Sequence, residues 1–83
     1  MPLPTTRTQV MRAIVAARGL PRARIVDVTG LTGAQVDQAL KRLKALGWVR
    51  REDRVAPARW LLTPIGRRLL RSGMAAVSYG RQP

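Results

Sequence analysis

Residues 29–51 read TGLTGAQVDQALKRLKALGWVRR, and residues 60–70 read WLLTPIGRRLL. In the first segment, Thr32 is a residue type that caps helix N-termini, and Gly47 is a type that ends helices. Between them, apolar residues recur at the spacing of one helical face, which predicts a helix over residues 33–46. Its buried stripe should consist of Val36, Ala39, Leu40, Leu43 and Leu46. Its outward positions should be Ala34, Asp37, Gln38, Lys41, Arg42 and Ala45.

Two further helices are predicted before this one. The first begins after a capping threonine at position 5, 6 or 8 and stops at Gly19. Its buried stripe should contain Val10, Ile14 and Ala17, with Met11 and Val15 beside them. A short second helix has Pro21 in its first turn and Gly30 at its end. Its inward residues should be Ile25 and Val28.

The segment after Gly47 predicts a β-hairpin followed by a last helix. Two short runs rich in strand-forming residues, 48–51 and 59–62, flank a polar stretch that is too long for a tight turn. Thr63 and Pro64 then form the N-cap and first-turn pair of a helix that ends near Ser72 and Gly73.

The expected register of the hairpin leaves apolar residues on both of its faces. This register has three pairs: Trp48 with Leu62, Arg50 with Trp60, and Val49 with Leu61. A small domain covers only one face of a hairpin easily. We therefore expect the tail from Met74 to Tyr79, or a second copy of the protein, to cover the side that carries Val49 and Leu61.

The composition restricts the kind of protein. The chain has 83 residues, enough for one compact domain, which we place at residues 5–71 with flexible or partner-packed termini at 1–4 and 72–83. Sixteen Lys and Arg residues against four Asp and Glu residues give a net charge of +12, which attracts phosphate polymers or acidic partners. With no Cys, no His and only scattered carboxylates, we expect no enzyme, no metal site and no cofactor. The longest apolar run, 13–17, is too short to span a bilayer, so a cytoplasmic protein is expected.

The order and spacing of these elements resemble a known family. Residues 8–71 are similar to the winged helix-turn-helix domain of small bacterial and phage regulators of the multiple-antibiotic-resistance type. The most specific segments are IVDVTGLT at 25–32, the Leu-rich helix that closes on Leu46, Gly47 and Trp48, and LTPIG at 62–66. The resemblance implies a mainly α fold with a three-helix core, a two-stranded wing and a C-terminal helix. It also implies double-stranded DNA binding in transcription regulation.

In that family, the N-terminal half of the helix expected at 33–46 enters the major groove, and the loop of the wing lies on the backbone or minor groove. Gln side chains can pair bidentately with adenine, and the amides after Thr32 can hold a phosphate. Arg54, near the tip of the wing, is suited to a minor groove. The residues expected to contact DNA are Thr32, Gly33, Ala34, Gln35, Gln38, Lys41, Arg42, Arg50, Arg51, Arg54 and Arg59.

Asp37 and Gln38 depart from the family pattern, in which a small hydroxyl residue and a basic residue are more usual at these positions. Phosphate would repel the Asp37 carboxylate unless it accepts from a cytosine amino group or pairs with Lys41 on the same helix.

Other partners remain open at the level of sequence. The fold could serve as a protein-binding adaptor or inhibitor whose basic surface grips an acidic protein. RNA or ribosome association is a third possibility, but aromatic residues placed to stack on bases are missing. The Arg-rich last helix is better explained as closing a core than as binding a membrane. A homodimer through the Val49 and Leu61 side or the C-terminal segment would suit two DNA half-sites.

Overall fold

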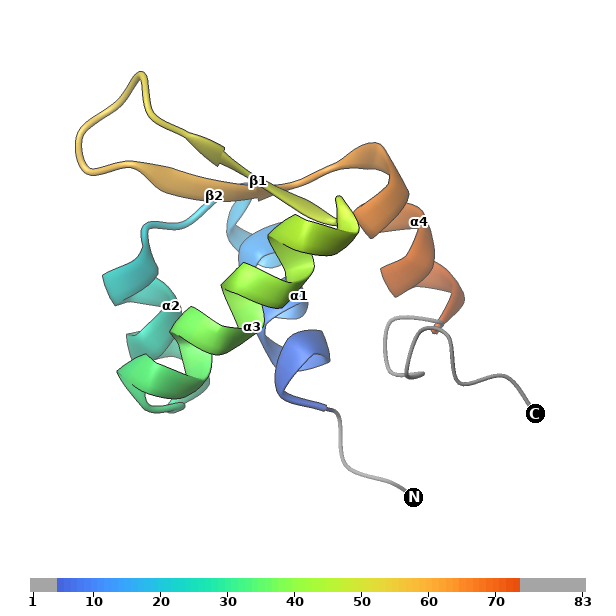
Figure 1. Cartoon of the computed structure of the whole chain (residues 1–83), viewed down its shortest axis with the longest axis horizontal. Coiled ribbons are helices and arrows are strands. Elements are labelled where there is room, and N and C mark those ends of the chain that lie inside the picture. The colour runs from blue at the N-terminus through green and yellow to red at the C-terminus, as the bar shows by residue number, and fades with distance from the viewer. Residues whose placement is uncertain (1–4, 74–83) are drawn as a thin grey trace.

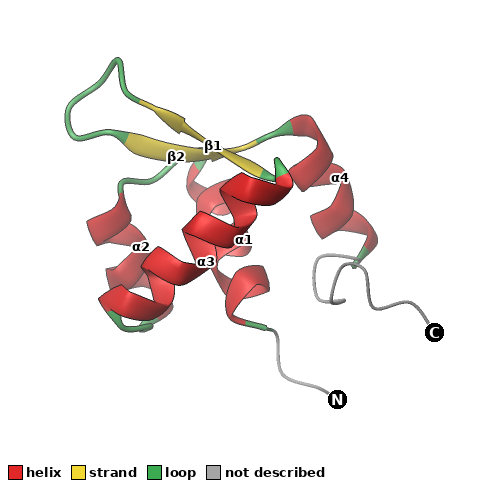
Figure 2. Ribbon diagram, viewed as in Figure 1, coloured by secondary structure: helices red, strands yellow, loops and turns green. Residues whose placement is uncertain are grey.

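The computed structural model describes residues 5–73. Three helices come first: α1 (Thr6–Ala17), α2 (Arg22–Thr29) and α3 (Gly33–Leu46). An antiparallel hairpin of β1 (Val49–Glu52) and β2 (Arg59–Leu62) follows, and α4 (Pro64–Ser72) ends the described chain (Figure 1). In Figure 2 the hairpin lies across one edge of the helical layer, with α2 and α4 at opposite ends. The predicted fold class, mainly α with a small hairpin, is confirmed.

Three helices begin at predicted threonine caps. The side-chain oxygens of Thr5, Thr32 and Thr63 each accept a hydrogen bond from a backbone N–H three residues later, at 3.1 to 3.2 Å. Each bond satisfies an amide that lacks an intrahelical partner and stabilises its helix by about 1 kcal/mol. The bounds predicted for α3, residues 33–46, are those of the structure, with Gly47 as its left-handed C-cap.

The core is aliphatic apart from Trp48. The α3 stripe is confirmed, since Val36, Ala39, Leu40 and Leu43 are buried, although Leu46 is only partly buried. The expectation was wrong at Ala17, which is exposed in the last turn of α1, where the chain turns away at Arg18. It was also wrong at Val28, which is 58% exposed because α2 packs on the core with Ile25 and in part Val26, and Val28 lies on another side of the helix.

The expected strand register was wrong by one residue. Four pairs are observed: Val49 with Leu62, Arg50 with Leu61, Arg51 with Trp60, and Glu52 with Arg59. Because a shift of one residue exchanges the two faces of a strand, Val49 turns into the core, where it is 2% exposed. Val49 and Leu61 therefore lie on opposite faces of the hairpin. They do not form the shared apolar face that was expected to receive a second copy. The expected partner segment, 74–79, lies outside the described residues.

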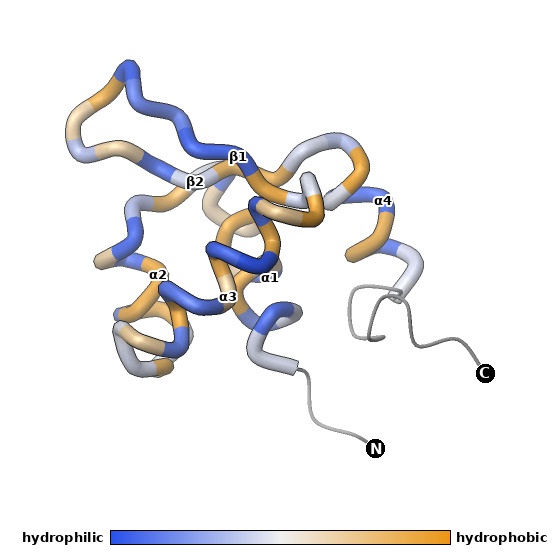
Figure 3. Tube along the Cα trace, viewed as in Figure 1, coloured by the Kyte–Doolittle hydropathy of each residue, from blue (hydrophilic) through white to orange (hydrophobic). Residues whose placement is uncertain are grey.

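The hairpin is anchored to the helices by the connection between α1 and α2. Leu20 and Trp60 exchange two backbone hydrogen bonds, of 3.1 and 2.7 Å, so that Leu20 extends the sheet at the β2 edge. The neighbouring Gly19 has a φ of +117° and lies against Leu61, whose side chain would be 2.7 Å from a Cβ at position 19. The base of the wing is thus fixed to the helical core. Figure 3 shows that hydrophilic residues follow β1 into the loop.

Candidate nucleic-acid interface

One side of α3 is free of the core. Opposite its buried stripe, the helical repeat places Ala34, Gln38, Lys41 and Ala45, all of which are exposed. Figure 1 shows the loop of the hairpin projecting past the helices on the side where α2 lies. The exposed side of α3 therefore has two flanks, one toward α2 and the wing and one toward the start of α1.

The first flank borders a hollow of about 650 Å³ between α2, α3 and the hairpin. Its lining includes the apolar side chains of Leu40 and Trp60. Among the described residues, it also includes four cationic side chains, Arg22, Lys41, Lys44 and Arg51, and a single carboxylate, Asp37. Three elements that are separate in sequence thus bring positive charge to one concave surface.

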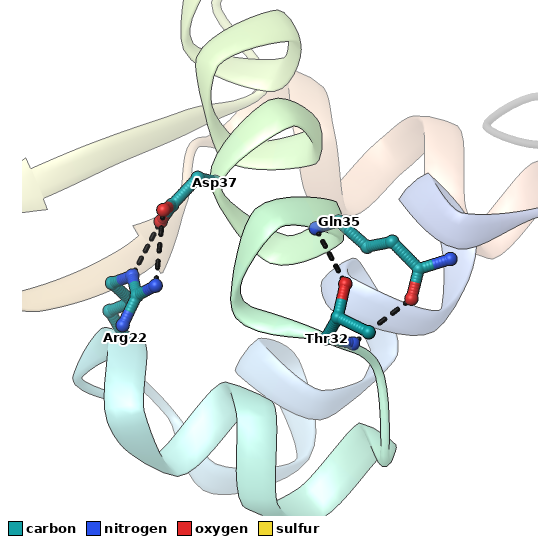
Figure 4. Close-up of polar contacts among 4 residues, drawn as sticks. All are labelled: Arg22, Thr32, Gln35 and Asp37. Carbon is teal, nitrogen blue, oxygen red and sulfur yellow. Dashed lines mark hydrogen bonds and ion pairs between the residues drawn. The ribbon is translucent and has the colours of Figure 1, made fainter.

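Asp37 is paired with α2 and not with Lys41. Nε and Nη2 of Arg22 donate to Oδ1 and Oδ2 of Asp37 at 2.5 and 3.0 Å, which is a bidentate ion pair (Figure 4). Both side chains are about half exposed. The hydrogen bond from Arg22 and its positive charge hold the pKa of Asp37 below its ordinary value, and the same contact raises the pKa of Arg22. The carboxyl group therefore stays ionised, and the positive charge of Arg22 offsets it beside the exposed side of α3.

The first turn of α3 is held by a capping box. Gln35 donates its backbone N–H to the Thr32 hydroxyl at 3.1 Å, and its side-chain oxygen accepts from the Thr32 backbone N–H at 2.9 Å (Figure 4). A bidentate contact with adenine needs both ends of the amide, so Gln35 would have to leave this box to make one. Gln38 has no such contact within residues 5–73 and is exposed. The N–H groups of Gly33 and Ala34 lie in the same first turn, beyond the reach of intrahelical carbonyl groups.

The second flank of α3 borders a hollow of about 340 Å³. Gln35, Gln38 and Arg42 line it together with Thr6 and Arg7 from the start of α1. Lys41 and Arg42, both expected to contact DNA, thus lie on different flanks.

The structure separates the arginines of the wing. Arg51 faces the first hollow beside Trp60, whereas Arg50 is paired with Leu61 and faces the reverse side. Arg59 also faces the reverse side, near Gly19. Arg54 has a side chain that is 91% exposed in the loop, 3.8 Å from a carboxylate oxygen of Glu52.

Sequence reasoning missed two cations of the first hollow, Arg22 and Lys44. The helical repeat could have indicated Lys44, because it is three residues after Lys41 and seven after Asp37, on the same flank. Arg22 had no such signal, since its place depends on how α2 packs on α3.

A helical core that exposes a capped helix beside a β-hairpin is a winged helix-turn-helix. Residues 2–59 match the sequence model of the MarR family, and the chain belongs to that family. No protein of curated function matches the chain.

Several solved structures have the same fold. BpsR of Bordetella bronchiseptica, described with the regulation of its DNA binding by 6-hydroxynicotinic acid, is 26% identical with a TM-score of 0.76, over 84% of this chain and 51% of that chain. A MarR-family transcriptional regulator from Silicibacter pomeroyi is 27% identical with a TM-score of 0.69, and the match covers 98% of this chain and 61% of that chain. A MarR variant from E. coli in complex with operator DNA is 20% identical with a TM-score of 0.75, and the match covers 92% of this chain and 56% of that chain. The chain thus spans between half and two thirds of the length of these proteins.

None of the helices in residues 5–73 has the length and apolar character needed to cross a membrane. The same residues contain no cluster of three or more His, Cys, Asp or Glu side chains that could hold a metal ion.

Proposed function

We propose that this chain is the DNA-binding module of a MarR-family transcriptional regulator and that it binds double-stranded DNA. The observation that carries the proposal is the hollow between α3 and the wing, whose lining combines Lys41 and Lys44 of α3 with Arg51 of β1. A cationic surface shared by a helix and a hairpin fits a phosphate backbone that crosses between them. The family and the operator complex of the E. coli relative support the same conclusion.

In this proposal, α3 enters the major groove. Gln38, which is exposed and has no hydrogen-bond or ion-pair partner within residues 5–73, is the side chain proposed to contact base edges. The first-turn N–H groups of Gly33 and Ala34 face phosphate, because the N-terminus of a helix carries partial positive charge. Thr32, Ala34 and Gln35 contribute through the capped first turn.

The wing supplies contacts that do not depend on sequence. Arg54, with its highly exposed side chain in the loop, is proposed to enter the minor groove or contact its edge. Arg51 and Lys41 contact phosphates over the first hollow, and Arg42 does so from the other flank. Arg50 and Arg59, on the reverse face of the hairpin, are proposed to contribute only through their charge.

We further propose that the protein regulates transcription and has no enzymatic activity, and that it acts in the cytoplasm, where bacterial DNA is found. Two copies on half-sites about one helical turn apart would match the usual two-fold symmetry of such regulators.

Fluorescence anisotropy with a labelled duplex of random sequence tests DNA binding. We expect the affinity to fall steeply between about 50 and 200 mM salt, because phosphate contacts release counterions. Replacing both Arg51 and Arg54 by Ala should lower the slope of log affinity against log salt by about two units. The control replaces Arg68 and Arg71 of α4, which removes the same charge from another element. Absent binding, or equal loss in both double variants, would defeat the proposal.

A further inference from the structure

The bidentate pair of Arg22 and Asp37 joins the first residue of α2 to the second turn of α3. Its two residues are fifteen positions apart in sequence. Exposed ion pairs contribute little to stability. The fold thus gains little from a pair so well aligned, while a carboxylate on a DNA-facing helix weakens phosphate binding unless something offsets it.

Gly33 leaves the space that the Arg22 side chain uses. A Cβ at position 33 would lie 2.6 Å from Nη2 of Arg22. The guanidinium therefore rests over Gly33 and Asp37, which are one helical turn apart on the flank of α3 that faces the first hollow. It lies at the N-terminal end of the helix proposed to enter the major groove.

The pair leaves most of the guanidinium available. An arginine has five N–H donors, and the contacts with Asp37 use two of them. Within residues 5–73 the remaining donors have no protein acceptor at hydrogen-bond distance, and the side chain is 49% exposed. Lys41, Lys44 and Arg51 line the same hollow, so the free edge of Arg22 adjoins a surface that already attracts phosphate.

We propose that Arg22 binds a phosphate of the DNA backbone and that Asp37 is its positioning residue. This inference rests on the proposed function and adds a contact on α2 to it. Two hydrogen bonds fix the long side chain before DNA arrives, so less conformational entropy is lost on binding. The planar guanidinium can hold the carboxylate with one edge and a phosphate oxygen with another. Asp37 therefore serves the interface through Arg22 and not through a base.

A double-mutant cycle tests this assignment in the 83-residue chain, with duplex affinity measured across a salt series. Arg22→Ala should weaken binding about tenfold and lower the log–log salt slope by about 0.9, the value for one phosphate contact. The matched control is Arg24→Ala, an exposed arginine two positions along the same helix and on another of its sides, which should change neither quantity by as much.

The Asp37→Asn variant shows whether Arg22 contacts a phosphate or only neutralises the charge of Asp37. In an Asp37→Asn background, Arg22→Ala should still lower the slope by about 0.9, while its loss of affinity should be smaller than in the wild type, because Asn no longer holds the guanidinium by two bonds. A slope unchanged by Arg22→Ala in this background would show that Arg22 only neutralises Asp37. An affinity loss equal in both backgrounds would remove the positioning role of Asp37.

The same data distinguish this inference from the proposed function. Steep salt dependence in the wild type, with equal behaviour of Arg22→Ala and Arg24→Ala, would overturn the role of Arg22 alone. Failure of the wild type to bind duplex would overturn both.

Discussion

The carbonyl oxygen of Trp48 occupies the position that a side chain on Gly66 would need. Around this contact, the Thr63 N–H donates to the same oxygen at 3.0 Å, and the Thr63 hydroxyl donates to the carbonyl oxygen of Gly47 at 2.7 Å. The N-terminus of α4 is thus fixed to the peptide that leads from α3 into β1. This contact joins the start of β1 to the end of β2 at the base of the wing.

Gly66→Ala should therefore destabilise the protein. The added methyl overlaps with backbone, which cannot move as a flexible side chain would, so we expect a loss of about 2 kcal/mol or more in the free energy of unfolding, measured by urea denaturation. Ile65→Ala is the control, because Ile65 is 55% exposed and its truncation should cost much less. Equal stability of Gly66→Ala and the wild type would contradict this packing.

Gly33→Ala, unlike Gly66→Ala, should lower DNA affinity without lowering stability. Its Cβ meets only the tip of the flexible Arg22 side chain, and Ala is a better helix former than Gly, so the free energy of unfolding should stay the same or rise. DNA affinity should fall because the guanidinium is displaced. In an Arg22→Ala background the same substitution should cause no further loss of affinity. A further loss there would mean that Gly33 acts on DNA directly and not through Arg22.

The Asp37 carboxyl should titrate below its ordinary pKa of 3.8. Since its pKa is lowered in the folded state, the pair contributes stability that is present above the ordinary pKa and is lost as the pH falls through the lowered pKa. NMR titration of the side-chain carboxyl carbon should show the low pKa in the wild type and a rise in Arg22→Ala. An unchanged Asp37 pKa in Arg22→Ala would mean that the pair does not persist in solution.

Gln38→Ala should alter the preference among duplexes. If Gln38 contacts an adenine edge, Gln38→Ala should weaken binding by about 1 to 3 kcal/mol for sequences with adenine at one position and change it little for the others. Competition assays with sequences selected from random DNA measure this difference. A uniform loss over all sequences would assign Gln38 to positioning on the backbone.

The elements whose signals are local could be predicted from the sequence. Thr32 and Gly47 correctly predicted the two ends of α3, because capping depends on residues within one turn. Thr63 and Pro64 likewise predicted the start of α4. The hairpin register could not be predicted, since Trp48 and Val49 are both apolar and so are the residues opposite them. An alternation of period two cannot choose between two registers that both place apolar residues inward.

The exposed positions of α3 that belong to the candidate interface could be predicted, because helical spacing separates them from the buried stripe. The contact between Arg22 and Asp37 could not, because it depends on the angle at which α2 meets α3. Strand alternation alone places Arg50 and Arg51 on opposite faces of the hairpin, but which of the two faces the first hollow follows from the register and could not be predicted.

The central claim, that DNA lies on α3 and the wing, is tested most directly by following backbone amide signals of the 83-residue chain by NMR during titration with a duplex selected from random DNA. We predict saturable shifts concentrated at residues 32–45 and 51–58 and at Arg22, with little change in α4. Shifts confined to α4, or no saturable shifts at all, would contradict it.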